Sequence, residues 1–265
     1  MVMDAPFNAA PDIDVLCEHY PIPGYGLIPI NAFVLKAQQP VLVDTGYPLN
    51  SDGFMDALKS VIDLEDLRWI WLTHTDRDHV GSIHRILEEA PQVRVITTFM
   101  SVGKMTLDAP LPMDRLNFLN PGEKFELGDR TITAVKPPSF DAGETVGFYD
   151  DKSEAFFSSD CFGALLQEPA FDAADVSQKE LTEAQVLWAT IDAPWLHSVD
   201  RGIFAKTLDG VRRMDPKVIL SSHLPPARGA TERFLSTLAS VPGTQPFQSP
   251  DQAALEAMVA EMTGA

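Results

Sequence analysis

Four side chains able to bind a metal crowd into one short stretch of this 265-residue chain. The segment His74-Thr75-Asp76-Arg77-Asp78-His79 places two imidazoles and two carboxylates directly after the apolar run Trp69-Ile70-Trp71-Leu72. That run is typical of a buried strand, and sheets flanked by helices place their sites in the loops at strand ends. Imidazole and carboxylate together suit a divalent cation of intermediate hardness. The alternative is a solvated loop in which Asp78 caps the next helix.

Three further candidates flank other apolar strands. Asp160 follows the run Phe156-Phe157-Ser158-Ser159, and His223 follows the predicted strand 217–222. Asp141 lies in a loop before a strand that starts near residue 145. Because all of these positions lie at or beside strand ends, we expect them to converge on one edge of a sheet.

This order of residues resembles the ligand signature of the metallo-β-lactamase fold superfamily, His-x-His-x-Asp-His followed by a lone His, a lone Asp and a final His. The resemblance covers roughly residues 25–230 and includes the turn Val43-Asp44-Thr45-Gly46. It implies an α+β fold, the αββα four-layer sandwich, with a dinuclear metal site.

Two positions depart from the hydrolases of that superfamily, because Asp76 replaces the second His and Asp141 replaces the lone His. A carboxylate at the second position is similar to the flavodiiron branch, which has His-x-Glu-x-Asp-His. The segments 73–82 and 156–163 also resemble that branch and its stand-alone oxygen-binding di-iron relatives. No flavodoxin domain, as in full flavodiiron proteins, is expected within these 265 residues.

The resemblance also implies how the ligands are shared. His74, Asp76 and Asp141 would hold one ion, and Asp78, His79 and His223 would hold the other. Asp160 would bridge the two ions at a separation of about 3.5–4 Å and is the candidate catalytic residue. Asp141 has an alternative role as a turn residue beside Gly143.

Ligand charge helps to choose between chemistries. Four carboxylates balance two divalent ions, whereas a hydrolase site of this fold, with two carboxylates, keeps a net charge of about +2. A neutral site lowers the pKa of bound water less, and its anionic oxygens stabilise an ion that is oxidised. Oxygen-rich ligation also favours iron or manganese over zinc.

The leading functional prediction is therefore a di-iron site that binds or reduces O2 or NO, with electrons from a separate partner. Iron is the favoured metal, with manganese or zinc as alternatives. The first alternative function is a metallo-hydrolase of small esters, thioesters or lactones that uses metal-bound hydroxide. The second is a non-catalytic sensor of metal or O2.

Net charge, cysteine content and apolar runs limit the partners and the location that we expect. The formal net charge of −18 disfavours nucleic acid and anionic membrane surfaces. The two cysteines, Cys17 and Cys161, form no disulfide framework, so a reducing compartment is expected. With no signal-peptide pattern and no apolar run of about 18 residues, the expected location is the cytoplasm.

The elements that must position the site can be predicted coarsely. Apolar patterns predict one domain over residues 1–265, with helices and strands in two mixed halves. Predicted strands cover 28–36, 40–44, 69–72, 94–99, 124–128, 130–136, 145–150, 155–158 and 217–222. Predicted helices cover 52–62 with Ser51 as cap, 80–90, 178–190, 198–214 and about 250–262 with a capping box at Ser249. The acidic loop 164–178 fits either a lid or the contact of a homodimer.

Several side chains near these elements are secondary candidates. Asp44 is either a turn residue or a carboxylate that orients a ligand histidine. Trp195 and His197 either line the pocket or begin a helix, and His19 either approaches the site or lies on the surface. The remaining two residues, His84 and Cys161, are expected to be structural.

Overall fold

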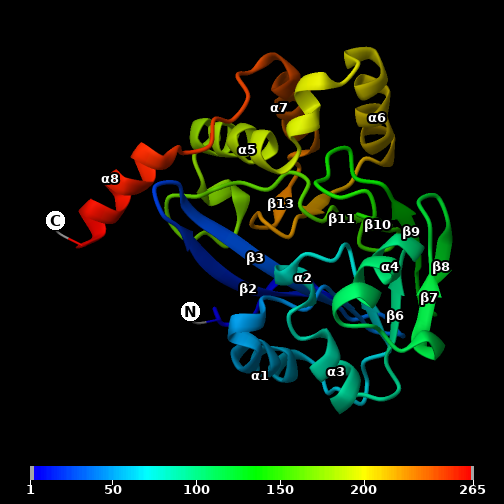
Figure 1. The fold of residues 1–265 in the computed structure, drawn as a ribbon. Coiled ribbons are helices and arrows are strands. Elements are labelled where there is room, and N and C mark those ends of the chain that lie inside the picture. Colours follow the sequence, from blue (N-terminus) through cyan, green and yellow to red (C-terminus); the bar gives the residue numbers. More distant parts are fainter. Residues whose placement is uncertain (1–2, 264–265) are drawn as a thin grey trace.

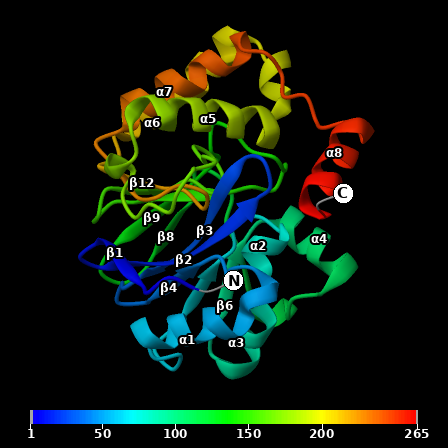
Figure 2. The ribbon, with the colours of Figure 1, turned by 90° about the vertical axis from the view of Figure 1, so that its left-hand side faces the viewer.

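Two β-sheets stack face to face and carry helices on their outer surfaces in a computed structural model that describes residues 3–263 (Figure 1). Helices α1 and α3 lie beneath the first sheet, and α5, α6 and α7 lie above the second (Figure 2). The predicted αββα sandwich is therefore confirmed. Among the described residues, no helix combines the length and the apolar character needed to cross a bilayer.

The first sheet contains seven strands in sequence order. Strands β1 to β4 pair antiparallel, and β4 to β7 pair parallel. The strands are β1 (Phe7–Ala10), β2 (Ile13–Ile22), β3 (Gly26–Leu35), β4 (Val41–Val43), β5 (Trp69–Trp71), β6 (Arg94–Thr97) and β7 (Leu116–Phe118). Its connecting helices are α1 (Ser51–Val61), α2 (Arg77–Val80), α3 (Ile83–Glu89) and α4 (Phe99–Asp108).

The second sheet contains six strands in the order β13-β12-β11-β10-β9-β8. They are β8 (Lys124–Glu126), β9 (Thr131–Val135), β10 (Gly147–Asp150), β11 (Ala155–Phe157), β12 (Val218–Leu220) and β13 (Ala227–Arg228). Only β11 and β12 pair parallel, and the long connection between them contains α5 (Gln178–Asp192) and α6 (Arg201–Met214). Two helices follow, α7 (Thr231–Ser240) and α8 (Gln252–Thr263). The C-terminal α8 lies at the margin of the sandwich (Figure 2).

Side-chain alternation along the strands builds three apolar layers. Phe33 and Phe157 point between the sheets, where their rings lie 5.5 Å apart edge to face. Their neighbours Val34 and Phe156 point outward, to the helices of the first and second sheet respectively. Because strand side chains alternate between the two faces, strands buried on both faces are apolar throughout, as these are.

Two predicted boundaries differ from the observed ones because local contacts end the element earlier. The predicted helix 80–90 is divided into α2 and α3 at Gly81, where a Cβ atom would lie 2.4 Å from the Gly46 carbonyl oxygen. The predicted strand 94–99 ends at Thr97, because the Thr98 hydroxyl accepts a hydrogen bond from the Ser101 amide and caps α4. Strands β1, β2, β7 and β13 and helices α4 and α7 were not predicted.

Two predicted caps are wrong. Ser51 is the first residue of α1, and Asn50 occupies the capping position. The helix predicted at 250–262 exists as α8, but its first amides are capped by Asp251, whose Oδ1 accepts from the Ala254 amide at 2.9 Å. Asp251 follows a proline, and its side chain reaches the third residue beyond it, as a capping aspartate does.

Candidate functional site

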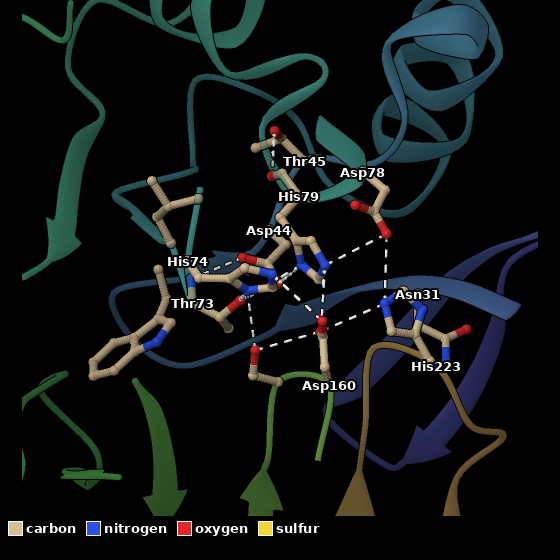
Figure 3. Close-up of polar contacts among 12 residues, drawn as sticks. Asn31, Asp44, Thr45, Thr73, His74, Asp78, His79, Asp160 and His223 are labelled. Atoms are coloured by element: carbon tan, nitrogen blue, oxygen red, sulfur yellow. Dashed lines mark hydrogen bonds and ion pairs between the residues drawn. The ribbon is translucent and has the colours of Figure 1, made fainter. Parts of the chain in front are cut away.

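Four loops meet at the edge where the parallel strands end. The residues His74 to His79 follow β5, and Asp44 follows the adjacent β4. From the facing sheet, Asp160 and His223 follow the parallel strands β11 and β12 (Figure 3). Parallel strands end at the same edge of a sheet, so the packing of two such edges brings these side chains together.

Asp160 lies at the centre of three imidazoles. Its Oδ2 is 3.4 Å from His74 Nε2, and its Oδ1 is 3.3 Å from His79 Nε2 and 3.5 Å from His223 Nε2. The two carboxylate oxygens therefore face different histidines (Figure 3). This arrangement fits a carboxylate that bridges two cations.

The other six predicted residues form two groups around Asp160. The ligand atoms of His74, Asp76 and Asp141 all lie within 4.8 Å of one another. The ligand atoms of Asp78, His79 and His223 do the same, with Asp78 Oδ2 3.4 Å from His223 Nε2. The structure thus brings these seven side chains together, and the two groups contain the residues predicted for each ion.

The outer nitrogen of each histidine is held by a neighbour. His79 Nδ1 lies 2.8 Å from Asp44 Oδ2, and His223 Nδ1 donates to the Pro29 carbonyl at 2.9 Å. His74 Nδ1 lies 3.2 Å from the Ser159 hydroxyl. These contacts leave all three Nε2 atoms facing Asp160 and orient the rings as metal ligands are oriented.

Two of those Nε2 atoms are buried without a hydrogen-bond partner, those of His74 and His79. An unsatisfied buried nitrogen costs about 1–3 kcal/mol. A cation held between the imidazoles and carboxylates would satisfy both nitrogens. The donor set and its orphaned atoms therefore fit a dinuclear metal group.

Backbone strain is concentrated in the same loops. Asp44 has a φ of 59°, and Ser159 and Phe162 have φ values of 53° and 70°. Left-handed backbone is uncommon in residues other than glycine and persists where the surroundings impose it. At Asp44 the imposing contacts are hydrogen bonds from the Thr73 amide and hydroxyl, both at 2.8 Å. Asp44 is thus the orienting carboxylate that was one of its two predicted roles.

Two residues that support the site were missed in the sequence. Asn31 on β3 donates to the carbonyls of Ser221 and Leu224 at 3.0 and 2.8 Å, which holds the loop on both sides of His223. Trp188 on α5 donates to the Asp160 carbonyl at 3.0 Å, and its ring lies 4.8 Å from that of His223. Neither residue stands beside a ligand in the sequence, so no local pattern marks it.

Opposite charges within the cluster stabilise one another. Burial disfavours the charged form of Asp160, but His74, His223 and His79 outweigh it and lower the pKa of this carboxyl. Burial also opposes protonation of His223, yet Asp160 and Asp78 raise its pKa to about 9. A raised pKa means that His223 binds a proton more readily than a free imidazole, and metal binding at Nε2 would displace that proton.

A fifth carboxylate, Asp192, lies beside the predicted set. One oxygen each from Asp141, Asp160 and Asp192 lie within 4.8 Å of one another. Burial, followed by the charges of Asp160 and Asp141, raises the pKa of Asp192 to about 8. Asp141 itself is exposed and accepts a hydrogen bond from the Thr145 hydroxyl at 3.3 Å.

The other secondary candidates stand apart from the histidine cluster. His19 Nδ1 pairs with Asp4 at 2.8 Å, and Cys161 is a buried core residue that accepts from the Ser139 hydroxyl. Trp195 donates to the carbonyl of Phe140, the residue before Asp141, at 2.7 Å. The two remaining histidines, His84 and His197, belong to none of the metal-ligand groups among the described residues.

The sequence of this chain is similar to those of known proteins. The family model described as "ODP family beta lactamase" matches residues 28–223. The chain is 25% identical over 167 residues to the anaerobic nitric oxide reductase flavorubredoxin of Citrobacter koseri, a match that covers 62% of this chain and 35% of that protein. The chain thus spans about a third of the length of that relative.

Solved structures show the same fold at low identity. The rubredoxin oxygen:oxidoreductase from Desulfovibrio gigas superposes with a TM-score of 0.79 at 17% identity, over 91% of this chain and 62% of that one. Fragment 1–254 of the putative diflavin flavoprotein A 5 from Nostoc superposes with a TM-score of 0.74 at 13% identity, over 99% and 98% of the two chains.

Proposed function

The chain belongs to the ODP family of the metallo-β-lactamase fold, and on this premise we propose that it holds a dinuclear iron centre that binds or reduces O2 or NO. The observation that carries the proposal is the position of Asp160, whose two oxygens face the Nε2 atoms of three histidines. Relatives in the comparison are named as a nitric oxide reductase and an oxygen oxidoreductase, which supports this substrate class.

In this proposal the seven predicted residues are the ligands. His74, Asp76 and Asp141 would hold one ion, Asp78, His79 and His223 would hold the other, and Asp160 would contribute to both; the proximity of the ligand atoms within each group supports this division. Four carboxylates balance the charge of two divalent ions, and such oxygen-rich ligation favours iron or manganese over zinc. Two bound ferrous ions would supply the electrons and the open coordination positions that a small diatomic molecule needs.

The remaining residues prepare the site for that chemistry. Asp44, Pro29 and Ser159 fix the three rings with Nε2 inward. Trp188 covers His223 and anchors Asp160 through its carbonyl, which restricts water on that side. The exposed carboxylates Asp76 and Asp141 mark the open side, by which a small substrate would enter.

A separate protein would supply the electrons in turnover. The name of the Desulfovibrio gigas protein includes rubredoxin, a small electron carrier, which supports such a partner. The acidic surface implied by the net charge of −18 favours a donor that presents positive charge at its docking face.

Metal analysis and oxygen exposure test the proposal. Protein purified without chelators should contain about two irons per chain, and Fe(II)-loaded protein should change its absorption spectrum when O2 or NO is admitted. His223→Ala should abolish the change, whereas His84→Ala, which removes a histidine outside the cluster, should not. Unchanged spectra in the loaded wild-type protein would refute the proposal. Zinc in the purified protein, together with turnover of p-nitrophenyl esters or lactones, would support the hydrolase alternative instead.

A further inference from the structure

We propose that Asp192 is an additional carboxylate ligand of this metal centre, on the same ion as His74 and Asp141. The inference rests on the dinuclear centre proposed above. It concerns a residue that the ligand order along the sequence does not include, because Asp192 stands 32 positions after Asp160 on a helix rather than in a loop after a strand.

The placement of Asp192 is unfavourable for an ionised carboxylate unless a cation lies beside it. It is the last residue of α5, where the helix dipole presents its negative end, and no basic residue stands in that last turn. Its Oδ2 is buried and has no hydrogen-bond partner, and it forms no ion pair among residues 3–263. Negative charge at a helix C-terminus is destabilising, and burial adds to that cost.

Two other carboxylates approach the same point. Oxygens of Asp141, Asp160 and Asp192 lie within 4.8 Å of one another and come from three separate segments of the chain. Like charges at this spacing repel, so the arrangement needs either a cation or a bound proton among the three groups. The trio shares Asp141 with the group formed by His74 and Asp76.

The imidazole of His74 independently identifies this side as a cation position. Its side chain is fully buried, its Nε2 has no hydrogen-bond partner, and that atom lies 3.4 Å from Asp160 Oδ2. A single ion between His74 and Asp160 would satisfy the orphaned nitrogen and the crowded carboxylates at once. Because an Asp192 oxygen lies within 4.8 Å of oxygens of Asp160 and Asp141, Asp192 would reach an ion held there.

A fifth carboxylate changes the charge of the centre. Asp76, Asp78, Asp141, Asp160 and Asp192 together carry −5 against +4 for two divalent ions. A centre with one excess negative charge stabilises a trivalent ion more than a neutral centre does. Asp192 therefore strengthens the preference for iron or manganese, which are readily oxidised, over zinc, which is not.

Metal titration of an isosteric variant tests the role of Asp192. Chelator-treated wild-type protein, Asp192→Asn and Asp192→Glu are titrated with Mn(II), and free Mn(II) is counted by its electron paramagnetic resonance signal. Glu183→Gln is the matched control, because it removes one carboxylate from an exposed position on the same helix. Thermal unfolding of each metal-free variant verifies that it is folded.

We expect two ions per chain in the wild-type protein and in Glu183→Gln. Asp192→Asn should weaken one of the two by at least about tenfold, since even residues that only orient a ligand are worth about 10–100-fold in affinity. Asp192→Glu, which keeps the carboxylate on a longer side chain, should weaken that ion less than Asp192→Asn does. If Asp192 instead carries a proton, Asn mimics it, and unchanged or tighter binding by Asp192→Asn overturns the inference.

The same titration separates this inference from the proposed function. Fewer than two ions in the wild-type protein overturns the dinuclear centre, whatever Asp192 does. A single ion that Asp192→Asn weakens still supports Asp192 as a ligand. A wild-type protein that binds no Mn(II) overturns both.

Discussion

Replacement of Asp44 by asparagine tests how strongly the structure around the ligands controls metal binding. Asp44 accepts three hydrogen bonds at 2.8 Å, from the Thr73 amide, the Thr73 hydroxyl and His79 Nδ1. Asparagine has the same shape and tolerates the left-handed backbone found here, with φ 59°. The Thr73 amide contact can therefore survive in Asp44→Asn. The amide group of the new side chain would face His79 Nδ1 and act as a donor.

That reversal changes the tautomer of His79. When Nδ1 accepts a hydrogen bond, the ring proton moves to Nε2, and a protonated Nε2 cannot bind a metal. Outer-shell substitutions of this kind reduce metal affinity by about 10–100-fold. The corresponding loss of binding free energy is about 1.4–2.8 kcal/mol. We expect it on the ion shared by Asp78, His79 and His223, with the other ion less affected.

Isothermal titration of the metal-free protein with Mn(II) measures the effect. Asp150→Asn is the matched control, since Asp150 is a fully buried carboxylate that pairs with Arg130 rather than with a histidine. The control should lower the melting temperature and leave metal affinity unchanged. Equal affinities for the wild-type protein and Asp44→Asn would show that the carboxylate does not orient His79, and the reasoning would fail.

Three further predictions concern the support of the site. Asn31→Ala leaves two buried carbonyls beside His223 unsatisfied, so we expect a loss of about 1–3 kcal/mol in the free energy of unfolding by urea, together with weaker metal binding. Gly81→Ala places a Cβ atom 2.4 Å from the Gly46 carbonyl and should cost about 1–3 kcal/mol by displacing α2, whereas Gly210→Ala, with nothing within 4 Å, should cost little in the same assay. In the metal-free protein the pKa of His223 is raised to about 9 and that of Asp192 to about 8, so the folded state holds both protons more tightly than the unfolded state. The stability that protonated His223 contributes is complete below pH ~6.5 and is lost as the pH rises through about 9. The stability that protonated Asp192 contributes is complete below pH ~4 and is likewise lost as the pH rises, through about 8. The melting temperature of the metal-free protein should therefore fall across this range, and the rise in melting temperature caused by Mn(II) should become larger. A rise that is the same from pH 6 to pH 9 would contradict the prediction.

Part of the site is determined by chain segments that are local in sequence. His74, Asp76, Asp78 and His79 lie within one turn-and-helix segment, so any fold that ends β5 before residue 74 keeps them together. Asp160 and His223 were also accessible to sequence reasoning, because each follows a short apolar strand, and strands of that kind end at one edge of a sheet. The αββα arrangement followed from the same periodicity together with the family resemblance.

Contacts that depend on helix packing were decided only by the tertiary structure. Trp188 and Asp192 reach the site because α5 packs across the second sheet through Leu181, Ala184 and Ala189, and nothing within α5 specifies which of its ends faces the metal ligands. Asn31 reaches the His223 loop across 190 residues of chain, through the pairing of two sheets. The physical reason is general: short-range patterns encode which face of an element is buried, whereas the partner that buries it is chosen by the summed packing of the whole core.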